Sequence, residues 1–162
     1  MKLILALLIF VAPFVTSAQS GTEDKKAAKL AAIKNMVESQ NYVFKAQTVM
    51  PMSGPIRQLT TDYDVKITKQ SVISFLPYFG RAYSAPMDPS KGGIQFTSKD
   101  FDYSLTPGKK DGWSVLIKPK DYRDVQQMTL TISSTGYAIA QVTSTSRQPI
   151  SFNGTIVAPK TK

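Results

Sequence analysis

The 162-residue sequence contains no histidine and no cysteine. Without histidine the chain cannot build a Ser-His-Asp triad or an imidazole metal site, and without cysteine it has no thiol nucleophile, thiolate zinc site or disulfide. The glycine-rich phosphate loops, the acidic calcium loop and the S-x-x-K motif are also missing. Only carboxylates, tyrosines, lysines, serines and threonines remain for chemistry, so we expect no metal, no cofactor and no catalytic site.

The carboxylates offer one arrangement of interest, because two pairs of aspartates stand two residues apart, Asp62 with Asp64 and Asp100 with Asp102. On a strand, each pair would face the same side of the sheet and could supply the acid and the nucleophile of a glycoside hydrolase. Both pairs alternate with aromatic residues that are expected to face inward. The carboxylates should therefore face water, and a carboxylate-based hydrolase ranks last among the functions considered.

The first residues have the pattern of a secretory signal peptide. A basic start at Lys2 leads into an apolar run over 3–15 and then a small-residue region over 16–18. The run is shorter than the roughly 20 residues of a membrane-spanning helix, although an uncleaved anchor is the alternative. No later segment is apolar enough to span a bilayer. Together with the absence of cysteine, this predicts cleavage after residue 18 and a periplasmic or secreted protein.

The formal net charge is +9, but the basic residues are scattered along the chain. They are adjacent only at Lys25-Lys26 and Lys109-Lys110. A nucleic-acid surface normally has a clustered basic stripe, so nucleic acid is not an expected partner. A general attraction to anionic surfaces or polymers is the simpler interpretation of the charge.

A single helix is predicted over 19–40, before the pattern changes to that of strands. The S-x-x-E spacing of residues 20–23 is that of a capping box, and apolar residues follow at helical spacing from Ala27 to Val37. Because the apolar stripe is narrow, the helix should lie against a larger body. A helix that binds a partner is the less favoured alternative.

From Asn41 onward apolar and polar residues alternate with period two, which is typical of antiparallel sheet with one buried face. The segments 107–112 and 134–136 are predicted hairpin turns, the first because it contains Asp-Gly. Gly154 is interpreted as a bulge or a point of close approach. The fold prediction is a mostly β domain over 41–157, a meander barrel or a sandwich, lipocalin-like in outline, with the N-terminal helix packed on it and a disordered tail over 158–162.

The stretch SFLPYFGRAYSAPM, residues 74–87, is the candidate site. Pro77 should start a turn, Gly80 should take a positive φ, and Phe75, Phe79 and Tyr83 should pack together. In a structural interpretation these aromatics close one end of the barrel and Arg81 pairs with a carboxylate or caps carbonyls. In a functional one, Tyr78 and Tyr83 line the mouth of a cavity where Arg81 anchors an anionic or sugar ligand.

Three segments in this order, SFLPYFGRAYSAPM, GGIQF and SSTGYAIAQVTSTSRQPISFNGTI, resemble the domain-of-unknown-function 4251 family of exported Bacteroidota proteins. The resemblance covers roughly 37–157. It implies export and a compact β-rich domain, and it brings no established activity, cofactor or catalytic residue. It also implies that the 76–83 loop lies near 147–152, with Arg147 holding loop carbonyls.

Taken together, these patterns predict an exported cell-envelope protein that is not an enzyme, most simply a β-barrel module for a small apolar or amphipathic ligand. Its partner would be that ligand or another envelope component. The alternative is a structural or interaction protein whose barrel is filled by its own side chains. A cavity opening near Tyr78 and Arg81 would favour the first, and a filled interior the second.

Overall fold

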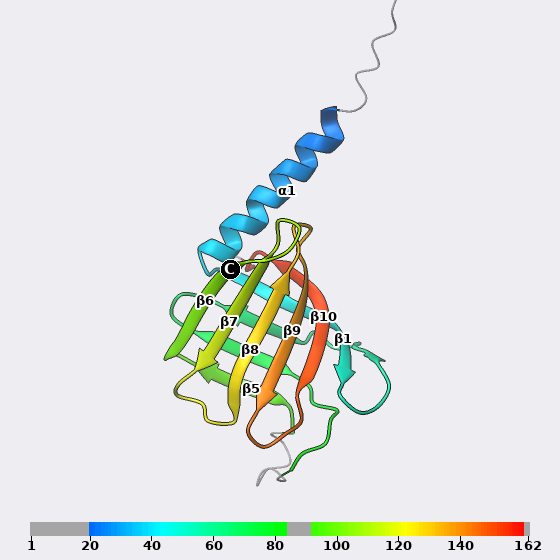
Figure 1. The fold of residues 1–162 in the computed structure, drawn as a ribbon, viewed down its shortest axis with the longest axis vertical. Helices are drawn as coiled ribbons and strands as arrows, with labels where there is room; N and C mark the ends of the chain where they lie inside the picture. Colours follow the sequence, from blue (N-terminus) through cyan, green and yellow to red (C-terminus); the bar gives the residue numbers. More distant parts are fainter. Residues whose placement is uncertain (1–19, 84–91, 161–162) are drawn as a thin grey trace, which may run out of the picture.

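The computed structural model describes residues 20–83 and 92–160, which form one helix and a ten-stranded sheet (Figure 1). The expected signal peptide and residues 84–87 of the aromatic stretch lie outside the described residues. The elements are α1 (Ser20–Glu38), β1 (Tyr42–Pro51), β2 (Arg57–Gln58), β3 (Asp64–Ile67), β4 (Val72–Leu76), β5 (Ile94–Ser98), β6 (Phe101–Pro107), β7 (Trp113–Pro119), β8 (Val125–Ile132), β9 (Tyr137–Ser144) and β10 (Ile150–Val157).

The strands follow the order β5-β4-β3-β1-β10-β9-β8-β7-β6, with β2 paired to β1, and all the ladders are antiparallel. The first and last strands are joined by the β1–β10 ladder. Among the described residues, a ladder is lacking only between the end strands β5 and β6. The sheet is therefore a nearly closed barrel, in which β1 and the strands that follow it pass behind β6–β9 (Figure 1). This confirms the mostly β prediction and selects the barrel over the sandwich.

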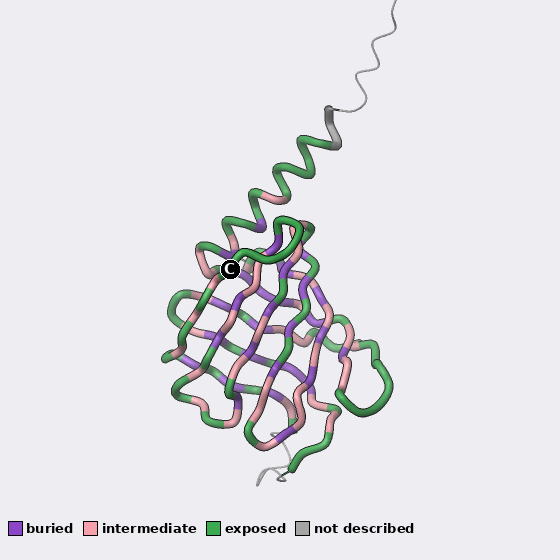
Figure 2. The backbone as a smooth tube through the Cα atoms, viewed as in Figure 1, coloured by how far each residue is buried: buried purple, intermediate pink, exposed green. Residues whose placement is uncertain are grey.

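The interior of the barrel is filled by the inward-facing side chains of its own strands. Alternation is clear in β4 and β10, where every second residue is buried (Figure 2). Burying each large apolar side chain contributes about 1.5–3 kcal/mol, so this core is the main source of stability. The largest fully buried side chains are Tyr42, Phe44, Phe152, Ile67, Leu76, Ile117, Met128, Leu130, Ile132 and Ile150.

The side chains that α1 buries against the barrel lie in its last turns. Ile33 and Val37 are buried, and the Tyr103 hydroxyl donates a hydrogen bond to the Val37 carbonyl (3.0 Å). Residues 23–29 are exposed, so the first half of the helix projects away from the barrel (Figures 1 and 2). The narrow apolar stripe seen in the sequence agrees with this, because little of the helix surface is apolar enough to bury.

A bulge in β1 lies opposite Gly154 of β10. The β1–β10 register shifts between Ala46 and Thr48, and Ala46 is the partner of Gly154. A Cβ atom at Gly154 would overlap the carbonyl of Lys45, whose carbon is 2.9 Å from that position. This confirms the interpretation of Gly154 as a point of close backbone approach.

The β6–β7 hairpin forms as expected, but its turn is one residue earlier than the Asp-Gly pair. Lys110 and Asp111 take positive φ angles of 52° and 57°, and the N–H of Gly112 donates to the Lys109 carbonyl (3.1 Å). Two central residues with positive φ are the property of a type I′ turn. Gly112 is needed for space, because a Cβ there would lie 2.5 Å from the Ile132 carbonyl oxygen.

The short connection between β5 and β6 is held by the carboxylate of Asp121. Asp121 accepts hydrogen bonds from the Ser98 hydroxyl and from the N–H groups of Lys99 (2.8 Å) and Asp100 (3.2 Å). These bonds, that from Ser98 above all, lower the pKa of Asp121 below its ordinary value of 3.8. The carboxylate thus links the β7–β8 connection to the ends of β5 and β6, the two strands that no ladder joins.

We expect the Asp121→Asn variant to be less stable than the wild type at pH 7, with the difference closing in acid. A carboxylate whose folded pKa is depressed stabilises the protein above its unfolded pKa and loses this effect as pH falls through the folded pKa. Urea unfolding at pH 7 and at stepwise lower values below pH 4 measures the difference. Asp100→Asn is the control, because Asp100 is an exposed carboxylate in the same turn. A difference for Asp121→Asn that persists unchanged in strong acid would contradict this role.

Candidate functional site

Tyr78, a predicted ligand residue, is held by the protein itself. Its hydroxyl lies within hydrogen-bond distance of the carbonyls of Arg81 (2.7 Å) and Gln148 (3.1 Å). The guanidinium of Arg147 lies 5.2 Å from the centre of its ring. Partial burial raises the pKa of Tyr78 above 10.0, so the hydroxyl stays protonated and donates. Tyr78 therefore fastens its loop to the chain before β10.

Arg147 is a buried charge at the same place, 7% exposed. It donates hydrogen bonds to the carbonyls of Gly92 (2.7 Å) and Gly93 (3.0 Å), and its Nη2 lies 3.6 Å from a carboxylate oxygen of Asp124. A bridge pairs Arg147 with Ala82. The 76–83 loop and the segment starting at Arg147 thus lie side by side, and Arg147 holds the carbonyls that precede β5.

Gly80 does not take the positive φ expected from the sequence; among the described glycines that angle occurs at Gly54 and Gly136. A Cβ at Gly80 would instead lie 2.5 Å from the hydroxyl oxygen of Tyr78. Glycine is therefore suited to this position by close approach to the Tyr78 ring. Pro77, the expected start of the turn, is buried beside it.

The expectation that Phe75, Phe79 and Tyr83 pack together inside is wrong. They are 42%, 40% and 70% exposed. The alternation of β4 places Ser74 and Leu76 inward and so turns Phe75 outward. Phe75 stacks on Tyr63 at 5.5 Å between ring centres, and Phe79 lies 5.0 Å from the guanidinium carbon of Arg57. Arg81 is exposed as well, so the loop does not bring Tyr78, Arg81 and Tyr83 into one enclosed site.

The paired carboxylates do not form an acid pair in a cleft. Asp62 and Asp64 both lie near Lys45, at 3.6 and 3.7 Å, and Asp102 pairs with Lys120 at 2.6 Å. Asp62 is almost fully exposed, whereas Asp64 is more buried than expected. Within the described residues, no three acidic side chains gather closely enough to hold a metal ion.

An apolar hollow lies where the β6–β7 hairpin meets the β8–β9 turn, and we call it the Trp113 hollow. Its volume is about 400 Å³, and its lining includes Trp113, Tyr137, Ile139, Thr131 and Lys109. Tyr137 and Ile139 are 44% and 39% exposed on the outer face of β9. Their position follows from the packing inside, because the inward residues beside them in β9 are Ala138 and Ala140, and Ala140 pairs with Phe152.

Sequence reasoning missed this hollow, since it depends on the register that sets Trp113 beside Ile132 and Thr131 beside Ile139. The available signal was the run YAIA in β9, in which large apolar residues alternate with alanine. A larger hollow of about 620 Å³ covers the β1 bulge, but polar side chains such as Gln47, Gln58 and Thr60 line much of it. Ligand pockets are mainly apolar with a few polar groups, which favours the Trp113 hollow as the candidate site.

These features define a single-domain antiparallel barrel with a filled interior, an N-terminal helix and an outer apolar hollow. The chain belongs to the family described as Domain of unknown function (DUF4251), whose model matches residues 24–156. The fold is similar to that of a DUF4251 family protein from Bacteroides eggerthii DSM 20697, with a TM-score of 0.60 over 82% of this chain and 91% of that chain at 15% identity. Among curated proteins no match was found. In residues 20–83 and 92–160, no helix is both long and apolar enough to cross a membrane.

Proposed function

We propose that this is an exported, non-enzymatic binding protein of the cell envelope, and that it holds a small amphipathic ligand in the Trp113 hollow. The observation that carries the proposal is the hollow itself, because its volume of about 400 Å³ and its apolar lining suit one small ligand. Tyr137 and Ile139 are large apolar side chains left in water on the barrel surface, where a ligand would cover them.

The outer surface is the better place for a ligand than the inside of the barrel. The interior is occupied by Tyr42, Phe44, Phe152 and the other core side chains. The Tyr78 hydroxyl, which was predicted to face a ligand at the mouth, donates to backbone carbonyls instead. The barrel then acts as a rigid support. The filled interior counts against the predicted ligand inside the barrel, so the ligand proposed here lies outside it. If no ligand binds, the structural alternative holds.

Trp113 is the single tryptophan of the chain, so its fluorescence reports directly on the hollow. We expect dodecyl maltoside, below its critical micelle concentration, to change the Trp113 emission in a saturable way. Ile139→Ser should weaken this binding about tenfold, since burying an isoleucine contributes about 1.5–3 kcal/mol and 1.4 kcal/mol is tenfold. Ile73→Ser is the matched control, because Ile73 of β4 is 40% exposed and Ile139 is 39% exposed.

A saturable change that Ile139→Ser weakens and Ile73→Ser leaves intact supports the proposal. The absence of a saturable change, or an equal effect of both variants, would leave the protein as a structural or interaction module. Export is tested separately, since protein recovered from the periplasm or the medium should begin at Gln19.

A further inference from the structure

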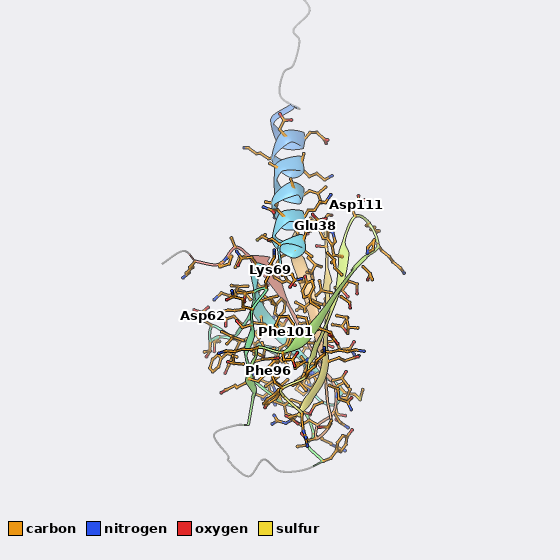
Figure 3. All side chains as sticks on the ribbon, turned by 90° about the vertical axis from the view of Figure 1, so that its left-hand side faces the viewer. Glu38, Asp62, Lys69, Phe96, Phe101 and Asp111 are labelled. Atoms are coloured by element: carbon orange, nitrogen blue, oxygen red, sulfur yellow. The ribbon has the colours of Figure 1, made fainter. Side chains whose placement is uncertain are left out.

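A second hollow adjoins the same two turns from the side of the helix. Its volume is about 170 Å³, and it is lined by Lys26 and Lys29 of α1 together with Asp111, Ser134 and Thr135 of the turns. The Trp113 hollow is bounded by neighbouring residues of these turns, including Lys109 and Ser133. The two hollows are therefore both bounded by residues of the same hairpin tips, at the helix end of the barrel, where Asp111 lies (Figures 1 and 3).

The charges at this place are mostly positive. Lys26, Lys29 and Lys109 line the two hollows, and Asp111 is the acidic residue of their linings. Among the described residues, none of these three ammonium groups forms an ion pair with a carboxylate, whereas Lys34 on the same helix pairs with Glu38 at 3.9 Å. An apolar hollow beside free ammonium groups matches a molecule with an apolar chain and a negative head.

We propose that the ligand is an anionic amphiphile, with its chain in the Trp113 hollow and its carboxylate or phosphate head near Lys26 and Lys29. This inference rests on the proposed function, and it adds the charge of the ligand and the residues that select it. The proposed occupant is a single molecule, with its chain in the hollow of about 400 Å³ and its head in the hollow of about 170 Å³. The helix that projects from the barrel thereby gains a role, since it places two lysines over the hairpin tips.

The test compares three probes with the same chain, dodecanoate, dodecyl maltoside and dodecyltrimethylammonium, each below its critical micelle concentration, followed by Trp113 emission at low salt. We expect dodecanoate to bind at least about tenfold more tightly than the neutral maltoside. This advantage should be largely lost in 0.5 M salt, because the interactions of exposed charges are screened. The double variant K26Q/K29Q should lower the affinity for dodecanoate to that for the maltoside and leave the latter unchanged.

The matched control is K25Q/K34Q, which removes the same charge from the same helix at residues that do not line the hollow. It should keep most of the dodecanoate preference. Equal binding of all three probes, or tighter binding of the cation, overturns the anionic inference while the proposed function stands. Binding of none of them overturns both. Binding to phosphatidylglycerol vesicles without binding to monomeric dodecanoate would replace a single ligand by a membrane surface and also overturn the inference.

Discussion

The Gly154→Ala variant is expected to lose about 3 kcal/mol or more of unfolding free energy, at the upper end of what overpacking costs. The added Cβ would overlap the Lys45 carbonyl and lie 3.1 Å from the ring of Phe44. The overlapping atoms belong to the backbone of β1, and the ladder on each side of the bulge keeps them in place. A flexible side chain could move aside, but these atoms cannot move without breaking the ladder.

Urea unfolding of the purified protein measures how much unfolding free energy the Gly154→Ala variant loses. Thr155→Ala is the control for position, because Thr155 is the next residue of the same strand and belongs to the outward-facing set. Its loss should stay below about 1 kcal/mol, as for most surface changes. If Gly154→Ala proved as stable as Thr155→Ala, the close approach of β1 and β10 described above would be wrong.

The second large effect is expected for Arg147→Met, with a loss of about 3–5 kcal/mol. The substitution keeps much of the apolar volume but removes the bonds to the Gly92 and Gly93 carbonyls and the partner of Asp124. Asp124 would keep only hydrogen bonds from serine hydroxyls, including that of Ser144 at 3.0 Å. A buried charge pair that loses one member is much less stable than either the intact pair or an apolar replacement of both.

Two further variants separate the role of Arg147 from that of charge alone. Arg147→Lys should recover only part of the loss, because an ammonium group cannot reach two carbonyls and a carboxylate with the fixed geometry of a guanidinium. Arg123→Met removes an exposed arginine that directly precedes Asp124 in the sequence. It should change the free energy of unfolding by less than about 1 kcal/mol. Equal losses for Arg123→Met and Arg147→Met would show that net charge, and not the carbonyl contacts, is responsible.

Much of the fold could be predicted from the sequence because alternation with period two is a local property. The strands, the helix, the hairpin at 107–112 and the close approach at Gly154 all follow from neighbouring residues. The outer position of Phe75 could not be derived in the same way. Within SFL, the alternation allows either Phe75 or its neighbours Ser74 and Leu76 to face inward. In the structure Ser74 and Leu76 are buried and Phe75 faces outward. A shift of one residue in this choice exchanges the two faces of a strand.

The candidate site was harder to predict, because its residues meet only through strand register. Trp113, Thr131 and Ile139 come from three strands, and no local pattern connects them. Tyr78 attracted attention in the sequence as a polar group among aromatics, whereas Arg147 was singled out only by the family resemblance. Both bind backbone carbonyls: for Tyr78 neither composition nor spacing indicates such a partner, and for Arg147 the resemblance implied carbonyls of the 76–83 loop, whereas the acceptors given above are those of Gly92 and Gly93.

The β1–β10 ladder also sets the order in which the molecule can be built. Most of the other ladders join strands that are neighbours along the chain and can form as soon as those strands exist. The partner of β1, in contrast, is β10, the last strand of the sheet in sequence order, and bringing two such distant segments together carries the largest loop-closure entropy in the sheet. The barrel therefore stays open until β10 has been synthesised. A chain whose barrel closes late remains incompletely folded for longer.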